Sequence, residues 1–174
     1  MLLRQAIERA AFSDFREFHK WSIERPDEFW SQAWDDLGIV GEKGKTISLG
    51  QGFEEKTWFP EAELNIVDTL LDGDLQTEVL VYRDEAGKRK AYSRGELRDE
   101  VARCAAAMIE SGVKSGDRVA AFTPNIPETV IFALAALSIG ALVSTASSDF
   151  GSTALVDRFG QIEPKVLLAS SGYH

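Results

Sequence analysis

Hydroxyl, carboxylate and glycine residues gather in residues 145–152, which read Thr-Ala-Ser-Ser-Asp-Phe-Gly-Ser. The segment precedes a predicted helix, whose first backbone N–H groups are free to bind an anion. An ordinary capping loop, in which Asp149 or Ser152 caps the helix, accounts for the same residues and is the simpler interpretation. The sequence therefore marks a candidate binding segment without assigning it a ligand.

Other reactive residue types do not assemble into a catalytic or metal-binding set. Gly44-Lys45-Thr46 resembles the end of a phosphate-binding P-loop, but the glycine required five positions earlier is Ile39. Cys104 lies on an apolar helical stripe, which predicts a buried, inert thiol. His19 and His174 lie far apart in the sequence, which disfavours a zinc site and leaves Mg²⁺ held by carboxylates open. We therefore predict no catalytic and no metal-ligating residue.

The composition is that of a globular, acidic protein. Of the 174 residues, 44% are hydrophobic and 27% are charged, and the formal net charge is −9. Such a surface repels phosphodiester backbones and anionic lipid headgroups, so we expect neither nucleic acid nor membrane as a partner. The longest apolar stretch, residues 130–143, is shorter than the ~20 residues that a bilayer span needs. With a single cysteine and no signal-like N-terminal run, we expect a soluble, cytoplasmic protein.

The N-terminal third of the chain predicts two helices and then a linker. Ser13 suits the cap of a first helix, and Pro26 suits the first position of a second, which Gly38 ends. Three of the four tryptophans lie in residues 13–37, and we expect this aromatic stripe to pack against a larger body. Residues 38–60 have no apolar periodicity, which predicts a loop or linker.

A short helix at 64–71 and a short hairpin are expected next. Apolar residues at 78–82 and 90–92, separated by a polar turn, predict the two strands of the hairpin. Ser93 and Glu96 have the spacing of a capping box, which opens a long amphipathic helix.

The last third of the chain predicts a strand–helix repeat. Apolar strands joined by helices favour a parallel sheet with right-handed crossovers. The fold class is therefore α/β, with N-terminal helices and a short hairpin leading into part of a mostly parallel, helix-flanked sheet. The expected strands are 118–122, 141–144 and 165–169, and the expected helices are 128–139 and 152–161.

The predicted order of elements also locates a binding edge. Ligands of open α/β sheets bind beyond the carboxyl ends of the strands, which here are followed by residues 123–125, 145–152 and 170–172. A parallel strand usually has a neighbour on each side, and the sequence stops shortly after the last strand. We therefore expect an incomplete domain that self-associates through an exposed sheet edge.

Residues 116–168 resemble the early part of the adenylate-forming acyl-CoA synthetases. Residues 91–97, Ala-Tyr-Ser-Arg-Gly-Glu-Leu, and 137–141, Leu-Ser-Ile-Gly-Ala, match two short motifs of that family. Residues 148–151 and 157–165 resemble more closely the acetoacetyl-CoA synthetase branch. The segments Trp58–Asn65 and Phe29–Trp34 agree with that branch, whereas Ile66-Val67 departs from the Tyr-Ala that its members often carry.

The resemblance implies an enzyme that uses ATP, CoA and Mg²⁺ to join a carboxylic acid to a thiol. It implies an N-terminal helical extension and linker at 1–57, and at 58–174 the first, truncated part of the large N-terminal domain. Asp149, Phe150 and Gly151 resemble the segment that lines the pantetheine channel of CoA, and Gly172 opens a stretch that contacts CoA. The family's phosphate-binding loop and catalytic lysine fall outside these residues, so we expect no cofactor to bind tightly to this chain alone.

Three functional hypotheses remain open from the sequence. The first is the N-terminal fragment of a ligase that activates acetoacetate as an acyl-adenylate and transfers it to CoA, inactive by itself. The second is the same part of a synthetase for another short acid, such as acetate or propionate. The third is a non-catalytic interaction module.

Overall fold

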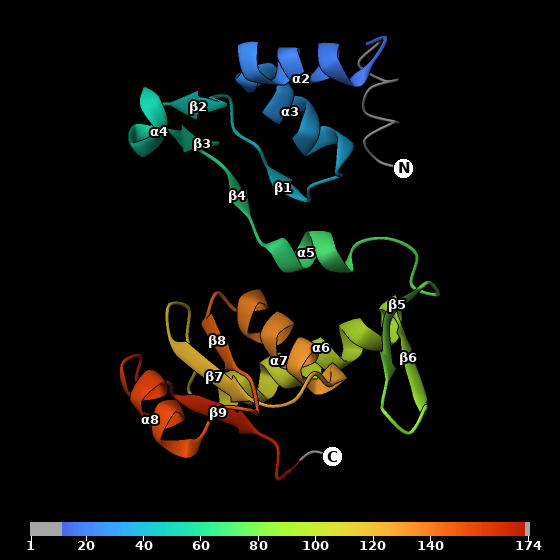
Figure 1. Cartoon of the computed structure of the whole chain (residues 1–174), viewed down its shortest axis with the longest axis vertical. Helices are drawn as coiled ribbons and strands as arrows, with labels where there is room; N and C mark the ends of the chain where they lie inside the picture. The colour runs from blue at the N-terminus through green and yellow to red at the C-terminus, as the bar shows by residue number, and fades with distance from the viewer. Residues whose placement is uncertain (1–11, 173–174) are drawn as a thin grey trace. The chain divides into compact units, whose positions relative to one another are not determined.

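The computed structural model describes residues 12–172, which form parts of two compact units, Met1–Leu64 and Asn65–His174. Figure 1 shows the elements of both units, and each unit is described by itself. His174 and the N-terminal residues considered for a signal sequence lie outside the described residues.

The first unit begins with two helices, α2 (Phe15–Glu24) and α3 (Pro26–Asp36). Pro26 occupies the first turn of α3, as predicted. The cap of α2 is Asp14 rather than Ser13, because the Asp14 carboxylate accepts the N–H groups of Arg16 and Glu17 at 2.8 and 3.0 Å. The Ser13 hydroxyl donates instead to the Glu17 carboxylate.

Aromatic rings hold the first unit together. The Phe29 ring lies 5.9 Å from Phe18 and 5.7 Å from Trp21, in edge-to-face arrangements that join α2 to α3. From α3, Trp30 contacts Trp58 at 5.7 Å and Trp34 contacts Phe59 at 5.0 Å. The aromatic stripe thus packs within the first unit, and its packing against a larger body stays a prediction.

The segment predicted as a loop, residues 38–60, contains three very short strands and one helical turn, and a fourth short strand follows it. Strand β1 (Gly41–Glu42) pairs with β4 (Glu63–Leu64), and both pairings in this segment are antiparallel. Strand β2 (Ser48–Leu49) pairs with β3 (Thr57–Trp58) around helix α4 (Gly52–Glu55). Strands of two residues are too short to show an alternating pattern, so the sequence does not reveal them.

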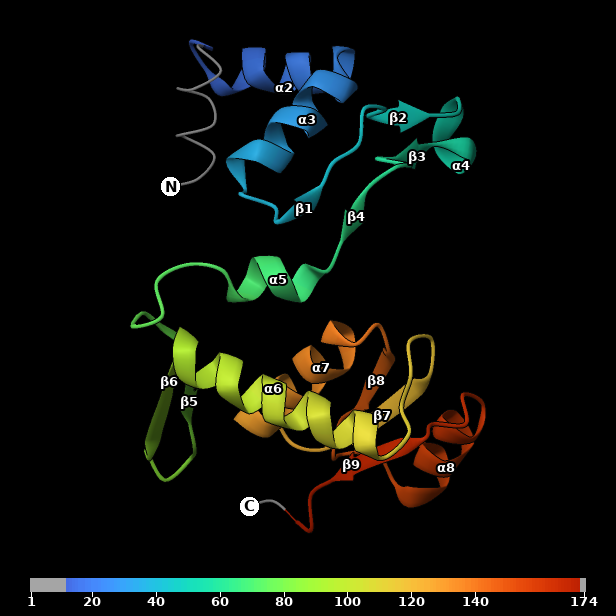
Figure 2. The same cartoon turned by 180° about the vertical axis from the view of Figure 1, so that it is seen from behind.

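The second unit opens with helix α5 (Ile66–Leu71) and the antiparallel hairpin of β5 (Glu78–Arg83) and β6 (Arg89–Ser93). Figure 2 shows helix α6 (Arg94–Glu110) running from this hairpin toward the three-stranded sheet. The predicted capping box is present, because the Ser93 hydroxyl accepts from the Glu96 N–H and the Glu96 carboxylate accepts from the Ser93 N–H.

A parallel three-stranded sheet forms the rest of the second unit and confirms the predicted α/β fold class. Its strands have the order β8-β7-β9 and are all parallel. The elements are β7 (Arg118–Phe122), α7 (Pro127–Ser138), β8 (Leu142–Ala146), α8 (Ser152–Gly160) and β9 (Val166–Ala169).

Helices cover both faces of this sheet. Val119 and Ala121 of β7 belong to a continuous core with α6 and α7, whereas Ala120 packs with Phe159 of α8 on the opposite face. This alternation explains why β7 is apolar at every position from 119 to 122. Among residues 12–172, no helix has the length and apolar character needed to cross a membrane.

Candidate functional site

The predicted site residues Asp149, Phe150 and Gly151 lie in the loop that joins β8 to α8, at the carboxyl edge of the sheet. The loop is closed by a turn in which the Phe150 N–H donates to the Ser147 carbonyl at 3.1 Å. The Ser147 hydroxyl donates to the Asp149 carboxylate at 3.1 Å. The N-cap residue of α8 is Gly151. Neither Asp149 nor Ser152, the two expected caps, occupies that position.

Phe150 and Gly151 present different surfaces to a ligand. The Phe150 ring is 37% exposed, and the Arg158 guanidinium lies 4.4 Å from its centre, a cation–π contact between the loop and the last turn of α8. A Cβ built on Gly151 would meet no atom within 4 Å, so the space beside this backbone is open. The loop thus combines an apolar ring, a fixed cation and an approachable backbone.

The structure brings together two other loops at the same sheet edge. Because β7 is the central strand, residues 123–126 after β7 lie beside residues 170–172 after β9, and the Ser170 N–H donates to the Phe122 carbonyl. Thr123 is buried, and its hydroxyl pairs with the Thr129 hydroxyl of α7 at 2.7 Å. Ligands of such sheets bind where the strand order reverses, which here is at β7.

The Gly44-Lys45-Thr46 segment has its donors occupied by the protein itself. The Glu61 carboxylate accepts from the Lys45 N–H and from the Thr46 hydroxyl, each at 2.7 Å. The Lys45 N–H, followed by the Thr46 hydroxyl, holds the pKa of Glu61 below its ordinary value. A fixed negative charge at these donors opposes the binding of a phosphate there.

Cys104 is half-buried, which corrects the expectation of a fully buried thiol. The buried stripe of α6 consists of Leu97, Val101, Ala105 and Met108, and Cys104 borders it. Burial raises the pKa of the Cys104 thiol, and the Glu100 carboxylate raises it further, so the thiolate is disfavoured. An inert thiol therefore remains the interpretation of this residue.

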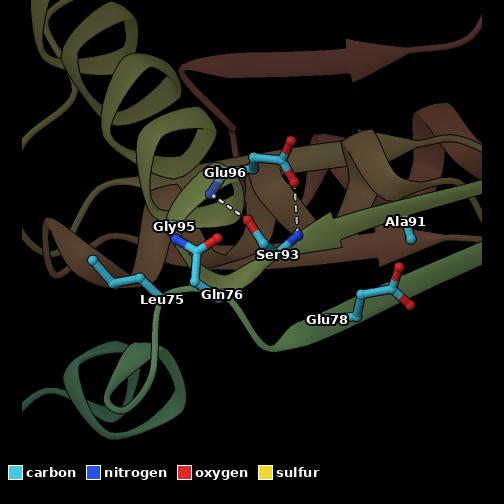
Figure 3. A pocket seen from close by; sticks show the side chains of 7 residues that line it. All are labelled: Leu75, Gln76, Glu78, Ala91, Ser93, Gly95 and Glu96. Atoms are coloured by element: carbon cyan, nitrogen blue, oxygen red, sulfur yellow. Dashed lines mark hydrogen bonds between the residues drawn. The ribbon is translucent and has the colours of Figure 1, made fainter.

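A hollow of about 500 Å³ lies at the N-terminus of α6 (Figure 3). Its lining includes Leu75, Glu78 and the capping-box residues Ser93 and Glu96. The Gly95 N–H donates to the Leu75 carbonyl at 2.9 Å, and the Glu96 N–H donates to Ser93. Because these first-turn donors have partners and Glu96 adds negative charge, this helix terminus does not offer an anion site.

Comparison with known sequences matches the chain to two family models that follow one another along it. The model described as AMP-binding enzyme matches residues 73–173. The model described as acetyl-coenzyme A synthetase N-terminus matches residues 15–69. The chain belongs to the AMP-binding enzyme family.

The similar members of that family are acyl-CoA synthetases. The chain is 38% identical to acetoacetyl-coenzyme A synthetase of Rhizobium meliloti over 94% of its own length and 25% of that protein. It is 40% identical to acetoacetyl-CoA synthetase of Xenopus tropicalis over 90% of its own length and 24% of that protein. The structure of acetoacetyl-CoA synthetase from Streptomyces lividans superposes with a TM-score of 0.87 at 31% identity, covering 94% of this chain and 26% of that one.

The chain thus spans about a quarter of the length of the AMP-binding enzymes that it matches. Within residues 12–172, no three His, Cys, Asp or Glu side chains are placed to hold a metal ion. In the Gly44-Lys45-Thr46 segment, whose sequence resembles the end of a P-loop, the Lys45 N–H and the Thr46 hydroxyl both donate to Glu61. We derive no catalytic step through ATP or Mg²⁺ from the described residues.

Proposed function

We propose that this chain forms the N-terminal part of an acid–thiol ligase that activates acetoacetate with ATP and transfers the acyl group to CoA. The observation that supports this most is the match to acetoacetyl-CoA synthetases over nearly the whole chain, in sequence and in fold. In the proposed reaction the acid's carboxylate attacks the α-phosphate of ATP and releases pyrophosphate. The CoA thiol then attacks the acyl carbon, loses its proton and displaces AMP.

The chain's own contribution to this reaction is structural. The second unit supplies a parallel sheet with its loops at the carboxyl edge. By resemblance to the family, we propose that the groups that handle phosphate and Mg²⁺ lie outside the 174 residues. The chain by itself should therefore neither bind ATP tightly nor turn over. The division into 1–57 and 58–174 and the cytoplasmic location stay predictions.

An activity comparison tests the ligase role in this proposal, apart from the choice of acid. The remainder of the Rhizobium meliloti enzyme, beyond the part that this chain matches, is fused after His174, and acetoacetate-dependent ATP–pyrophosphate exchange is measured. The fused protein should catalyse the exchange, and the 174-residue chain should not. Exchange by the chain alone would refute the structural role, and an inactive but folded fusion would refute the ligase assignment.

We further propose that Asp149, Phe150 and Gly151 contact the pantetheine arm of CoA. The open backbone beside Gly151 and the exposed Phe150 ring support this role. In the fused protein, Gly151→Leu should raise the KM for CoA and leave acetoacetate-dependent exchange unchanged, since CoA enters only in the second step. Gly160→Leu, at the other end of α8 and equally open, is the control and should alter neither quantity.

A second candidate substrate is acetate or propionate. It is supported by the match to the acetyl-coenzyme A synthetase N-terminus and by 31% identity to acetyl-coenzyme A synthetase of Deinococcus radiodurans. ATP–pyrophosphate exchange by the fused protein with each acid in turn reports only the acid preference of the added part. The same exchange, measured on a full-length protein that carries this chain in its own sequence, would decide the substrate.

A non-catalytic module is the third candidate, and the association state of the chain separates it from a fragment. We propose that the isolated chain self-associates through the outer edge of β8, where Leu142 is 58% exposed. Light scattering after gel filtration should show that the isolated chain forms oligomers and that the Leu142→Lys variant is monomeric. A monodisperse monomer that melts cooperatively would favour the module.

A further inference from the structure

Helix α8 is fixed on the parallel sheet by its apolar face. Phe159 is buried against Ala120 of β7, and Leu155 and Ile162 pack against the same cluster. The residue before Phe159 is Arg158, whose side chain lies exposed in the last turn of the helix. The backbone of Arg158 is therefore held in place by the core contact of its neighbour.

The Arg158 side chain returns to the loop that precedes its own helix. At about 1.5 Å per residue, Ser152 and Arg158 lie roughly 9 Å apart along the axis of α8. Helical side chains tilt toward the N-terminus, so a long side chain in the last turn is directed back toward the first. The guanidinium of Arg158 reaches the Phe150 ring and lies 4.4 Å from its centre. A cation on a fixed helix thus holds an aromatic ring on the loop.

The Phe150 ring lies next to open space. It is 37% exposed, and a Cβ built on the following residue, Gly151, would meet no atom within 4 Å. Exposed side chains change rotamer within picoseconds to nanoseconds, so a ring without its cation would also visit the space beside Gly151. That space is the one through which the pantetheine arm of CoA is proposed to approach the backbone.

We propose that Arg158 is a positioning residue for the binding of CoA, because it holds the Phe150 ring away from the Gly151 backbone and keeps the approach to that backbone open. This role rests on the proposed contact of Asp149, Phe150 and Gly151 with the pantetheine arm. Arg158 acts through the ring and does not contact CoA itself. Its effect on CoA therefore depends on the presence of the Phe150 ring.

Proteolysis of the 174-residue chain measures the hold on the ring without CoA. Chymotrypsin takes an aromatic side chain into its hydrophobic pocket, so it cleaves after Phe150 when the ring has left Arg158. The cleavage rate then follows the population of this open form. Arg158→Gln should speed the cleavage about two- to fivefold, which is the factor that an exposed cation–π contact contributes. Arg158→Lys keeps a cation and should speed it less.

Two controls separate this effect from a general loosening or a change of charge. Cleavage after Phe53 of α4, whose side chain is 99% exposed, is the internal reference and should stay constant. Arg98→Gln removes the same charge from an exposed position of α6 and should leave cleavage after Phe150 at the wild-type rate. Equal cleavage after Phe150 in the Arg158→Gln and Arg98→Gln variants would overturn the proposal.

Kinetics of the fused protein test the role in CoA binding. Arg158→Gln should raise the KM for CoA about two- to fivefold with at most a small change in kcat, Arg158→Lys should raise it less, and Arg98→Gln should not raise it. In a Phe150→Leu background, Arg158→Gln should add nothing, because no ring is left to hold. A further rise in KM in that background would mean that Arg158 contacts CoA directly and would overturn the proposal.

Failure of the underlying CoA contact gives a different pattern. Gly151→Leu would then leave the KM for CoA unchanged, while Arg158→Gln would still speed cleavage after Phe150. That result would overturn the role of Arg158 in CoA binding and establish its hold on the ring.

Discussion

At the scale of single residues, Glu61 shows how a protein can occupy a site that resembles one for a ligand. Its carboxylate takes the backbone and hydroxyl donors of Lys45 and Thr46, which a phosphate would otherwise use. Because folding lowers the pKa of Glu61, the unfolded chain binds this proton more readily than the folded one. The stabilisation is therefore present at neutral pH and is lost on acidification through and below the ordinary value of 4.5.

Glu61→Gln should remove that part of the pH dependence. The variant should be less stable than the wild type at pH 7, and the difference should shrink as the pH falls below the ordinary carboxyl range, since the protonated acid and the amide are then both uncharged. Thermal melts followed by circular dichroism from pH 7 to pH 3 measure it. Glu63→Gln, two residues further on, is the control. An equal loss of stability in both variants would contradict the role given to the Glu61 carboxylate.

At the scale of elements, the capping box of α6 makes a direct prediction. Ser93→Ala removes the acceptor of the Glu96 N–H at the start of this 17-residue helix. Loss of an N-cap serine costs about 1 kcal/mol. Denaturant unfolding of the second unit should show this loss. Ser111→Ala, at the other end of α6, removes a hydroxyl bond to the Ala107 carbonyl and should cost clearly less; a larger effect there would contradict the assignment of the cap.

The turn from α7 to β8 depends on glycine for two separate reasons. Gly140 has a φ of +72°, and a Cβ there would lie 2.6 Å from the Ser115 hydroxyl. Gly112, after α6, has a φ of +84° with open space around it. Both alanine variants should lose about 1–2 kcal/mol for the left-handed backbone, and Gly140→Ala should lose more because of the contact. Equal destabilisation in urea titrations would show that Ser115 moves aside freely.

Elements with a strong local signal could be predicted from the sequence. The apolar runs of β7 and β9 and the Ser93–Glu96 spacing indicate structures that depend on nearby residues alone. The cap of α2 could not be assigned, because Ser13 and Asp14 are both good caps and the backbone geometry decides between them. The strand order β8-β7-β9 is set by pairing between distant segments, which no local pattern records.

The candidate site was predictable to the same extent. The sequence places residues 145–152 before a helix, and the structure places them at the carboxyl edge of the sheet. The contact between Phe150 and Arg158 spans two turns of α8, and no motif predicts it. The adjacency of residues 123–126 and 170–172 follows only from β7 being the central strand.

At the scale of the whole molecule, the two units differ in how their cores are built. The second unit has a continuous buried cluster that joins α5, β6, α6, β7 and α7. In the described part of the first unit, Phe18 is the one buried apolar side chain, and partly exposed aromatic rings supply the remaining contacts. Regions with few buried apolar contacts open at lower free energy, so the two units should not unfold together.

Hydrogen exchange on the intact chain tests this difference. The amides of α2 and α3 should exchange through a lower opening free energy than those of β7, whose Val119, Ala120 and Ala121 are fully buried. Phe18→Ala should lower the opening free energy of α2 and α3 by up to about 3 kcal/mol, as expected for a truncated core phenylalanine, and leave β7 unchanged. Met108→Ala, in the core of the second unit, should lower the opening free energy of β7 and leave that of α2 and α3 unchanged. One common opening free energy for both helices and β7, shifted equally by either variant, would mean that a single cooperative core spans the chain.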